Sequence, residues 1–230
     1  MSSKQENSLR DWIALSFIIG VGSRTAALLI DRFGSPAAVF ESSSNSLESA
    51  GLRRETIDAI KSSEPREKAA REIEELGRLG GEALTLTNEG YPKLLRETYD
   101  PPIVIYSLGD VASAFSQPAI AIVGSRRCST YGRNVAEKLS RDLAERGVTI
   151  VSGLARGIDS AAHRGALDGR GLTVGVMGTG LDAVYPKENR KLAARIAEQG
   201  VLVTEFPFAT PRRHRTFRSA TASSAGSRWV

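Results

Sequence analysis

Three short loops carry the residues of this sequence that could do chemistry. They read "IVGSRRCSTYG", "VSGLARGID" and "VMGTGLDAVYPKEN", and in each a glycine or a Ser-Gly pair follows an apolar run. Glycine lets a ligand approach the backbone amides closely, and Arg126, Arg156 and Lys187 add one cation to each loop. Amides and cations that converge in this way bind anionic groups such as phosphates. The loops therefore predict an anion site.

This predicted site differs from the usual nucleotide pockets. Gly124 is followed by Ser-Arg-Arg, so the first loop has no G-x-G-x-x-G pattern, and the "GTG" at Gly178–Gly180 lacks a third glycine. The P-loop pattern G-x-x-x-x-G-K-[ST] is also absent from the sequence. We therefore expect neither a dinucleotide nor a nucleoside triphosphate, and no cofactor.

The sequence offers no catalytic apparatus and no metal ligands. His163 lies in a predicted helix and is interpreted as a structural or solvent-facing histidine, and Cys128 has no histidine near it in the sequence. With one cysteine and two histidines in the chain, a zinc set cannot be assembled. Asp159 is expected to cap the helix that follows its loop, with a ligand contact as the alternative. These residues favour a binding protein over an enzyme.

The loops are positioned by apolar runs that alternate with amphipathic segments from Ala119 onward. Such a pattern predicts a parallel sheet that is covered on both faces, in which ligands bind at the carboxyl ends of the strands. In the first helix Val135, Leu139 and Leu143 share one face. We expect a partial Rossmann-like domain over residues 119–209. Its strands are "AIAIVGS", "VTIVSG", "LTVGVMG" and "VLVTEF", and its helices are "GRNVAEKLSRDLAERG", "GIDSAAHRGALDG" and "PKENRKLAARIAEQG".

The part of the chain before the sheet reads as short helices. Residues 1–63 predict a helical module of the SAM-like or helix-hairpin-helix kind, with a turn "GVGSRTA" around Gly20 and Gly22. The amides of this turn could hold a DNA phosphate, or the turn could serve protein contacts inside a small bundle. Residues 64–118 predict a helix and short strands that connect the module to the sheet.

The overall charge gives little support to a nucleic-acid partner. The chain has 31 basic and 26 acidic residues, a formal net charge of +5. The tail from Pro211 carries five arginines and no acid, so the rest of the chain is neutral overall. The single cysteine fits a reducing compartment, no apolar run approaches the ~20 residues of a membrane helix, and the start lacks a signal-peptide pattern. We expect a cytoplasmic protein with no membrane contact.

Several segments together resemble the DNA-processing protein A family (DprA/Smf). They are "AIVGSRRCSTYG", "IVSGLARGIDSAAHRGAL" and "GTGLDAVYPKENRKL", preceded by "GYPKLLRETYDPPIVIYSLGD" and the helical module, and the resemblance runs from about Leu9 to Phe208. It implies a protein that binds single-stranded DNA and loads the RecA recombinase onto it during natural transformation. It also implies a homodimer for full-length members, whose dimer and RecA contacts fall largely after Phe208. The implied DNA and phosphate site is made of Gly124, Ser125, Arg126, Ser152, Gly153, Arg156, Gly157, Lys187 and Asn189, with a base contact near Tyr185.

The tail "TPRRHRTFRSATASSAGSRWV" does not follow the family pattern, which continues with F-P-x-R-N-R-I-I-S-G. Back-translation of Phe217–Val230 with freely chosen wobble bases, read one nucleotide earlier, gives this motif. We therefore expect a frameshift near Thr210–Thr216, residues 210–230 as a non-native or disordered basic tail, and function impaired by truncation; a genuine basic tail that binds DNA is the alternative. On this interpretation the fourth strand lacks its neighbours and has an open edge.

Two other functions compete with the DNA-binding interpretation. One is a Rossmann-like phosphoribohydrolase of the lysine-decarboxylase-like type, but the glutamate of its P-G-G-x-G-T-x-x-E segment has no counterpart in "GTGLDAVYP". The other is a protein-interaction module that uses the N-terminal helices alone.

Overall fold

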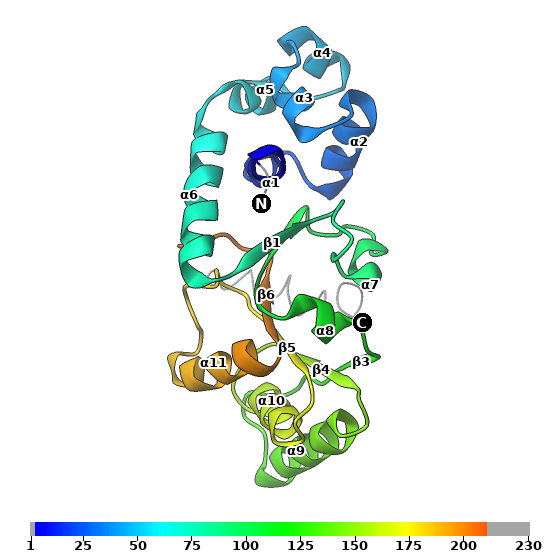
Figure 1. Cartoon of the computed structure of the whole chain (residues 1–230), viewed down its shortest axis with the longest axis vertical. Helices are drawn as coiled ribbons and strands as arrows, with labels where there is room; N and C mark the ends of the chain where they lie inside the picture. The colour runs from blue at the N-terminus through cyan, green and yellow to red at the C-terminus, as the bar shows by residue number, and fades with distance from the viewer. Residues whose placement is uncertain (1–2, 211–230) are drawn as a thin grey trace.

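A single six-stranded sheet runs through the middle of the molecule (Figure 1). The computed structural model describes residues 3–210. The strand order is β1-β2-β6-β5-β4-β3. Strands β3 to β6 are parallel, β2 is antiparallel to β6, and β1 is antiparallel to β2. The strands are β1 Glu82–Thr85, β2 Val104–Gly109, β3 Ala119–Ala121, β4 Thr149–Ser152, β5 Thr173–Val176 and β6 Val201–Thr204.

The helical module stands at one end of the sheet, as Figure 1 shows. Its buried core includes Trp12, Ile13 and Leu15 from α1 and Leu29 from α2. Ser35 caps α3 by accepting a hydrogen bond from the amide of Ala38 at 3.2 Å, as serine before a first-turn proline is expected to do. The helices are α1 Ser3–Ser16, α2 Ser23–Phe33, α3 Pro36–Glu41, α4 Ser44–Ser49, α5 Arg54–Lys61 and α6 Glu64–Leu79.

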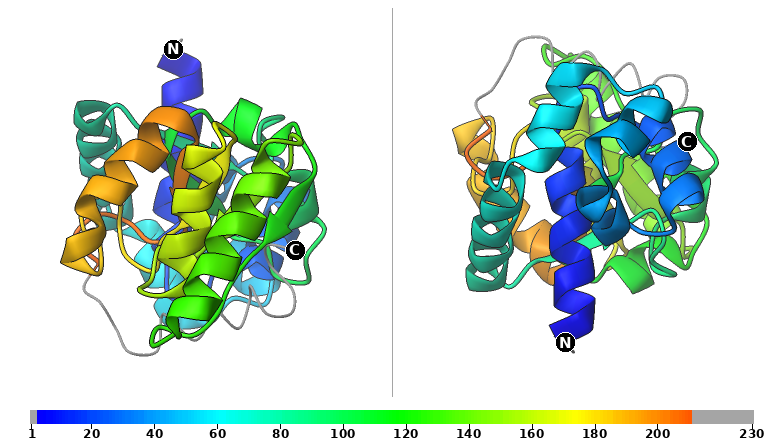
Figure 2. Two further views of the ribbon diagram at one scale, coloured as in Figure 1. Left: turned by 90° about the horizontal axis from the view of Figure 1, so that it is seen from below. Right: turned by 90° about the horizontal axis from the view of Figure 1, so that it is seen from above.

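Three longer helices lie side by side over one face of the parallel strands (Figure 2, left). They are α9 Thr130–Ala144, α10 Ile158–Asp168 and α11 Arg190–Gln199, and each connects two successive parallel strands. The short helices α7 Lys93–Arg96 and α8 Val111–Phe115 contribute Leu95 and Val111 to an apolar cluster with Val151, Val174 and Val203 of the sheet. The expected alternation of strands and helices from Ala119 onward is confirmed, within a mixed α/β fold.

The expectation of an open edge at the fourth parallel strand is wrong. Strand β6 lies between β5 and β2, with Tyr106 opposite Thr204 in the antiparallel register. Val201 and Val203 are completely buried as a result. The segment that the sequence indicated as a connector supplies β1 and β2, so it is part of the sheet. Residues 211–230, on which the predicted frameshift and basic tail fall, lie outside the described part of the chain.

The parallel strand that lies at an edge of the sheet is β3 instead. In residues 3–210 this strand pairs with β4 alone, and Ile120 is 43% exposed. On α9, Val135 and Leu139 are 45% and 48% exposed. The sequence predicted that these apolar residues would be covered. They are not, because the described chain places no further strand beside β3.

Candidate functional site

The three loops singled out in the sequence meet at the carboxyl ends of β3, β4 and β5. A cavity of about 180 Å³ lies between them. Its lining comes from all three loops: Arg126, Arg127, Ala155, Arg156, Tyr185 and Pro186. Three guanidinium-bearing residues and one aromatic ring therefore share one small cavity. This is the convergence of cations that the parallel sheet predicts.

Glycines in the first two loops let these loops pack against each other. Gly157 has φ +79°, and a Cβ atom there would lie 2.2 Å from the backbone oxygen of Ser125. A Cβ atom on Gly124 would lie 2.7 Å from Cγ1 of Ile158. The backbone amide of Ile158 donates to the same Ser125 oxygen at 3.3 Å. These two glycines therefore serve contacts within the protein, in addition to any ligand.

Asp159 joins the first and second loops. Its carboxylate is 5% exposed and accepts hydrogen bonds from the amides of Gly124 and Ala155, both at 3.4 Å. Burial raises the pKa of Asp159, while these amides and the charge of Arg126 oppose the rise. The helix α10 begins after Gly157, which makes no side-chain cap. The expectation that Asp159 caps this helix is thus wrong, because its carboxylate turns toward the loops.

Two predicted site residues point into the protein. Asn189 is 8% exposed, and its Nδ2 donates to the Leu154 oxygen at 2.8 Å and to Ser160 Oγ at 2.9 Å. Ser152 Oγ donates to the Ile122 oxygen at 2.7 Å. Asn189 thereby fixes the third loop against the second. Both side chains position the loops, and a direct contact from either to a ligand stays a prediction.

The predicted cations differ in their surroundings. Lys187 is exposed, begins the short 3-10 helix Lys187–Asn189, and is not part of the cavity lining. Arg156 forms a two-pronged ion pair with Glu188, with Nε–Oε1 at 2.5 Å and Nη2–Oε2 at 2.7 Å. This pair lowers the pKa of the Glu188 carboxyl and raises the pKa of Arg156.

Sequence reasoning missed two residues of this site, Arg127 and Glu188. The signal for Arg127 was its place beside Arg126 in a loop of three polar residues. Glu188 stands between Lys187 and Asn189, but its partner is 32 positions away along the chain. Only the fold brings that pair together.

The glycine turn of the helical module has an acidic partner of its own. Ser23 Oγ donates to Asp100 Oδ1, so a carboxylate lies at the start of α2. Arg24 stacks on the ring of Tyr99 at 5.1 Å. Of the two interpretations of "GVGSRTA", the structure favours contacts within the protein, because the position that a phosphate would take is next to Asp100.

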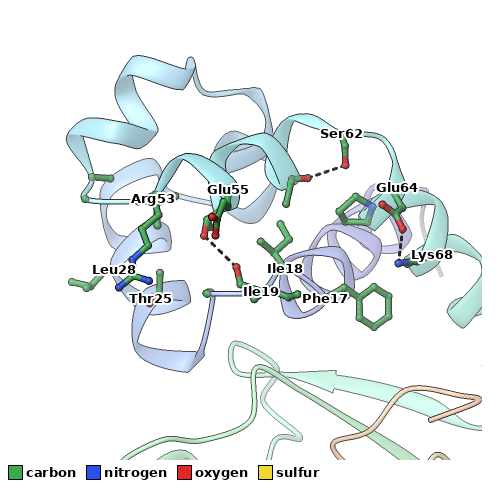
Figure 3. A pocket seen from close by; sticks show the side chains of 17 residues that line it. Phe17, Ile18, Ile19, Thr25, Leu28, Arg53, Glu55, Ser62, Glu64 and Lys68 are labelled. Atoms are coloured by element: carbon green, nitrogen blue, oxygen red, sulfur yellow. Dashed lines mark hydrogen bonds and ion pairs between the residues drawn. The ribbon is translucent and has the colours of Figure 1, made fainter. Parts of the chain in front are cut away.

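A larger cavity, of about 840 Å³, opens in the helical module (Figure 3). Phe17, Ile18 and Leu28 give it an apolar lining. Its lysine, Lys68, pairs with Glu64 at 2.6 Å, and Thr56 Oγ1 donates to the Ile19 oxygen at 3.2 Å. The charges here are of both signs, so the loop cavity remains the better candidate for an anion.

His163 is a structural residue, the first of the two expected alternatives, and it does not face solvent. It is completely buried, its Nδ1 lies 2.8 Å from Thr173 Oγ1, and burial lowers its pKa to about 3. Within residues 3–210, no group of three or more histidine, cysteine, aspartate or glutamate side chains could hold a metal ion. None of the helices of the same part of the chain is long and apolar enough to cross a membrane.

Comparisons with known proteins agree on one family. The sequence model described as DNA recombination-mediator protein A matches residues 82–220. The chain is 34% identical over 219 residues to Protein Smf of Synechocystis sp., covering 94% of this chain and 55% of the relative. The chain thus spans about half the length of the curated relatives it matches.

Two solved structures resemble this chain. DNA processing protein A from Streptococcus pneumoniae superimposes with a TM-score of 0.72 at 26% identity, over 91% of this chain and 70% of that one. DNA processing protein A from Helicobacter pylori gives a TM-score of 0.54 at 32% identity, over 60% of this chain and 62% of that one. The latter is a structure concerned with a single-stranded DNA binding mode.

Proposed function

Because this chain belongs to the DNA recombination-mediator protein A family, we propose that it binds single-stranded DNA at the cavity between its three loops. The observation that carries the proposal is the convergence of Arg126, Arg127 and Arg156 with Tyr185 around that cavity. Guanidinium groups contact phosphates without reading sequence, and an aromatic ring supplies a stacking surface for a base. The single-stranded DNA binding mode of the Helicobacter pylori relative supports this choice of ligand.

The predicted site residues divide into two roles in this proposal. Arg126, Arg156 and Lys187 contact phosphates beside Ser125, while the backbone amides of Gly124 and Gly153 are turned toward the Asp159 carboxylate. Gly157, Ser152 and Asn189 hold the loops in place through the contacts described above. The hydrolase alternative gains no support, because the six residues that line the cavity include no carboxylate, and the carboxylate of Glu188 beside them is held by Arg156.

The finer parts of the proposal follow the family. We propose that the bound strand is passed to the RecA recombinase, in keeping with the family description as a recombination mediator. The role is one of binding and delivery in the cytoplasm, and no reaction is assigned to the chain. A homodimer, expected for full-length members, is part of the same proposal.

A binding titration with a matched control tests this function. Fluorescence anisotropy of labelled single strands of two different sequences is measured with wild type, Arg126→Ala and Arg78→Ala. Arg78 is exposed on α6 and pairs with Glu74 and Glu75. Arg78→Ala therefore removes one positive charge, as Arg126→Ala does, but away from the cavity. Arg126→Ala should weaken the binding of both strands on the order of tenfold. It should also lower the slope of log affinity against log salt concentration by about 0.7.

Two outcomes would overturn the proposal. One is a folded wild-type protein that binds neither strand even at low salt. The other is an Arg126→Ala affinity no lower than that of Arg78→Ala.

A further inference from the structure

The ion pair between Arg156 and Glu188 stands at the cavity where the proposed strand binds. Arg156 lines the cavity, and Glu188 of the third loop holds Arg156 through both carboxylate oxygens. Both side chains are more than half exposed, at 59% and 54%. The pair is thus at the surface, and neither partner is locked in place by burial.

A carboxylate in this geometry occupies the same donors that a phosphate would use. Arginine presents Nε and Nη2 as a planar fork that fits a carboxylate or a phosphate equally well. Glu188 takes both of these donors. A phosphate that binds Arg156 through the same edge must therefore displace Glu188, and it then lies close to a second negative charge.

We propose that Glu188 is a built-in competitor for phosphate at Arg156, which lowers the affinity of the cavity for a polyanionic strand. The proposal rests on the proposed function, since it assumes that the cavity takes a nucleic-acid phosphate. Exposed ion pairs are weak, so the competition is one that a strand with several phosphate contacts overcomes. Glu188 thus sets the affinity of the cavity for the strand, because a phosphate of the strand has to replace the Glu188 carboxylate on Arg156.

The test is a set of four proteins with one control. Binding of a labelled oligothymidylate is measured for wild type, Glu188→Gln, Arg156→Ala and the double variant. Glu74→Gln serves as the control, because it removes one exposed, paired carboxylate from α6. Glu188→Gln should bind about two- to fivefold more tightly than wild type at low salt, a gain of the size that an exposed pair is worth.

Two further readouts separate competition from a general charge effect. The gain should shrink toward none as salt is raised, because an exposed pair is screened. In the Arg156→Ala background the same Glu188→Gln change should have a smaller effect, because no guanidinium is left to release. Thermal melts of each variant check that the fold is kept.

The outcomes distinguish the inference from the function beneath it. If wild type binds and Glu188→Gln equals Glu74→Gln, the competition is refuted and the binding function stands. Weaker binding by Glu188→Gln would also refute it, because Glu188 would then orient Arg156 for the strand. If no protein of the set binds the oligonucleotide at any salt, the proposed function itself fails.

Discussion

Replacing Gly157 by alanine should damage both the stability of the protein and its proposed DNA binding. Gly157 combines φ +79° with ψ −123°, a region of backbone conformation that is nearly closed to residues with a side chain. Its Cβ atom would lie 2.2 Å from the Ser125 oxygen and 3.0 Å from Cα of Arg126. All of these neighbours are backbone atoms, so no flexible side chain can move aside. The first loop must shift, and Arg126 shifts with it.

Gly34 provides the matched control for this substitution. It ends α2 with φ +87°, and a Cβ atom there would meet no heavy atom within 4 Å. Gly34→Ala therefore measures the conformational cost alone, about 1–2 kcal/mol. Gly157→Ala adds the steric conflict, and forced overpacking typically costs about 1–3 kcal/mol more. For a chain of this size each kcal/mol lowers Tm by about 2–4 °C.

The assay is a pair of thermal melts combined with the binding titration. We expect Gly157→Ala to melt at a clearly lower temperature than Gly34→Ala and to bind single-stranded DNA more weakly. Gly34→Ala should bind like wild type. Equal melting temperatures and equal affinities for the two variants would refute the idea that close packing of the first two loops positions Arg126.

Two other substitutions test buried polar groups. Burial raises the pKa of Glu72 from its ordinary 4.5 to about 7. Ionisation above pH 4.5 therefore favours the unfolded chain, and the stability of the fold decreases as the pH rises toward about 7. Glu72→Gln should abolish this decrease and stabilise the protein at pH 8 by up to about 3 kcal/mol. Urea titrations at several pH values measure it, and a stability difference independent of pH would contradict it. Asn189→Ala removes the donors to Leu154 and Ser160 and should lower the unfolding free energy by about 1–3 kcal/mol. Lys187→Ala, two positions away and exposed, should change the unfolding free energy little. Equal unfolding free energies for the two variants would argue against the positioning role of Asn189.

The meeting of the three loops was predictable from the sequence because it depends on local patterns. Apolar runs that alternate with amphipathic segments imply parallel strands, and parallel strands place their following loops at one edge. The order of residues along the chain is therefore enough to assign Arg126 and Arg156 to one site, and the cavity brings them together. The direction of the Asn189 side chain could not be assigned in this way, because it depends on partners in another loop.

The pairing of β2 with β6 could not be predicted for a related physical reason. The two strands are separated by almost one hundred positions, and a short apolar run does not specify its partner. The run "IVIYSLG" indicated a strand but carried no information about its neighbour. For α9 the sequence pattern gave a wrong prediction of burial, since Val135 and Leu139 have helical spacing and are nevertheless exposed to solvent.

The pairing of β2 with β6 also decides where this chain can be divided. The alternating pattern that starts at Ala119 suggests a boundary at residue 118, between the helical module with its connector and the predicted sheet. A fragment that began at Ala119 would leave one side of β6 without hydrogen-bonded neighbours and uncover Leu202, which is 3% exposed in the intact fold. The amide of Phe208 would also lose its acceptor, Glu72 of α6, at 2.8 Å. The two halves share one sheet and a buried cluster that takes residues from both, so a fragment that keeps the partners of β6 and Phe208 has to begin before α6.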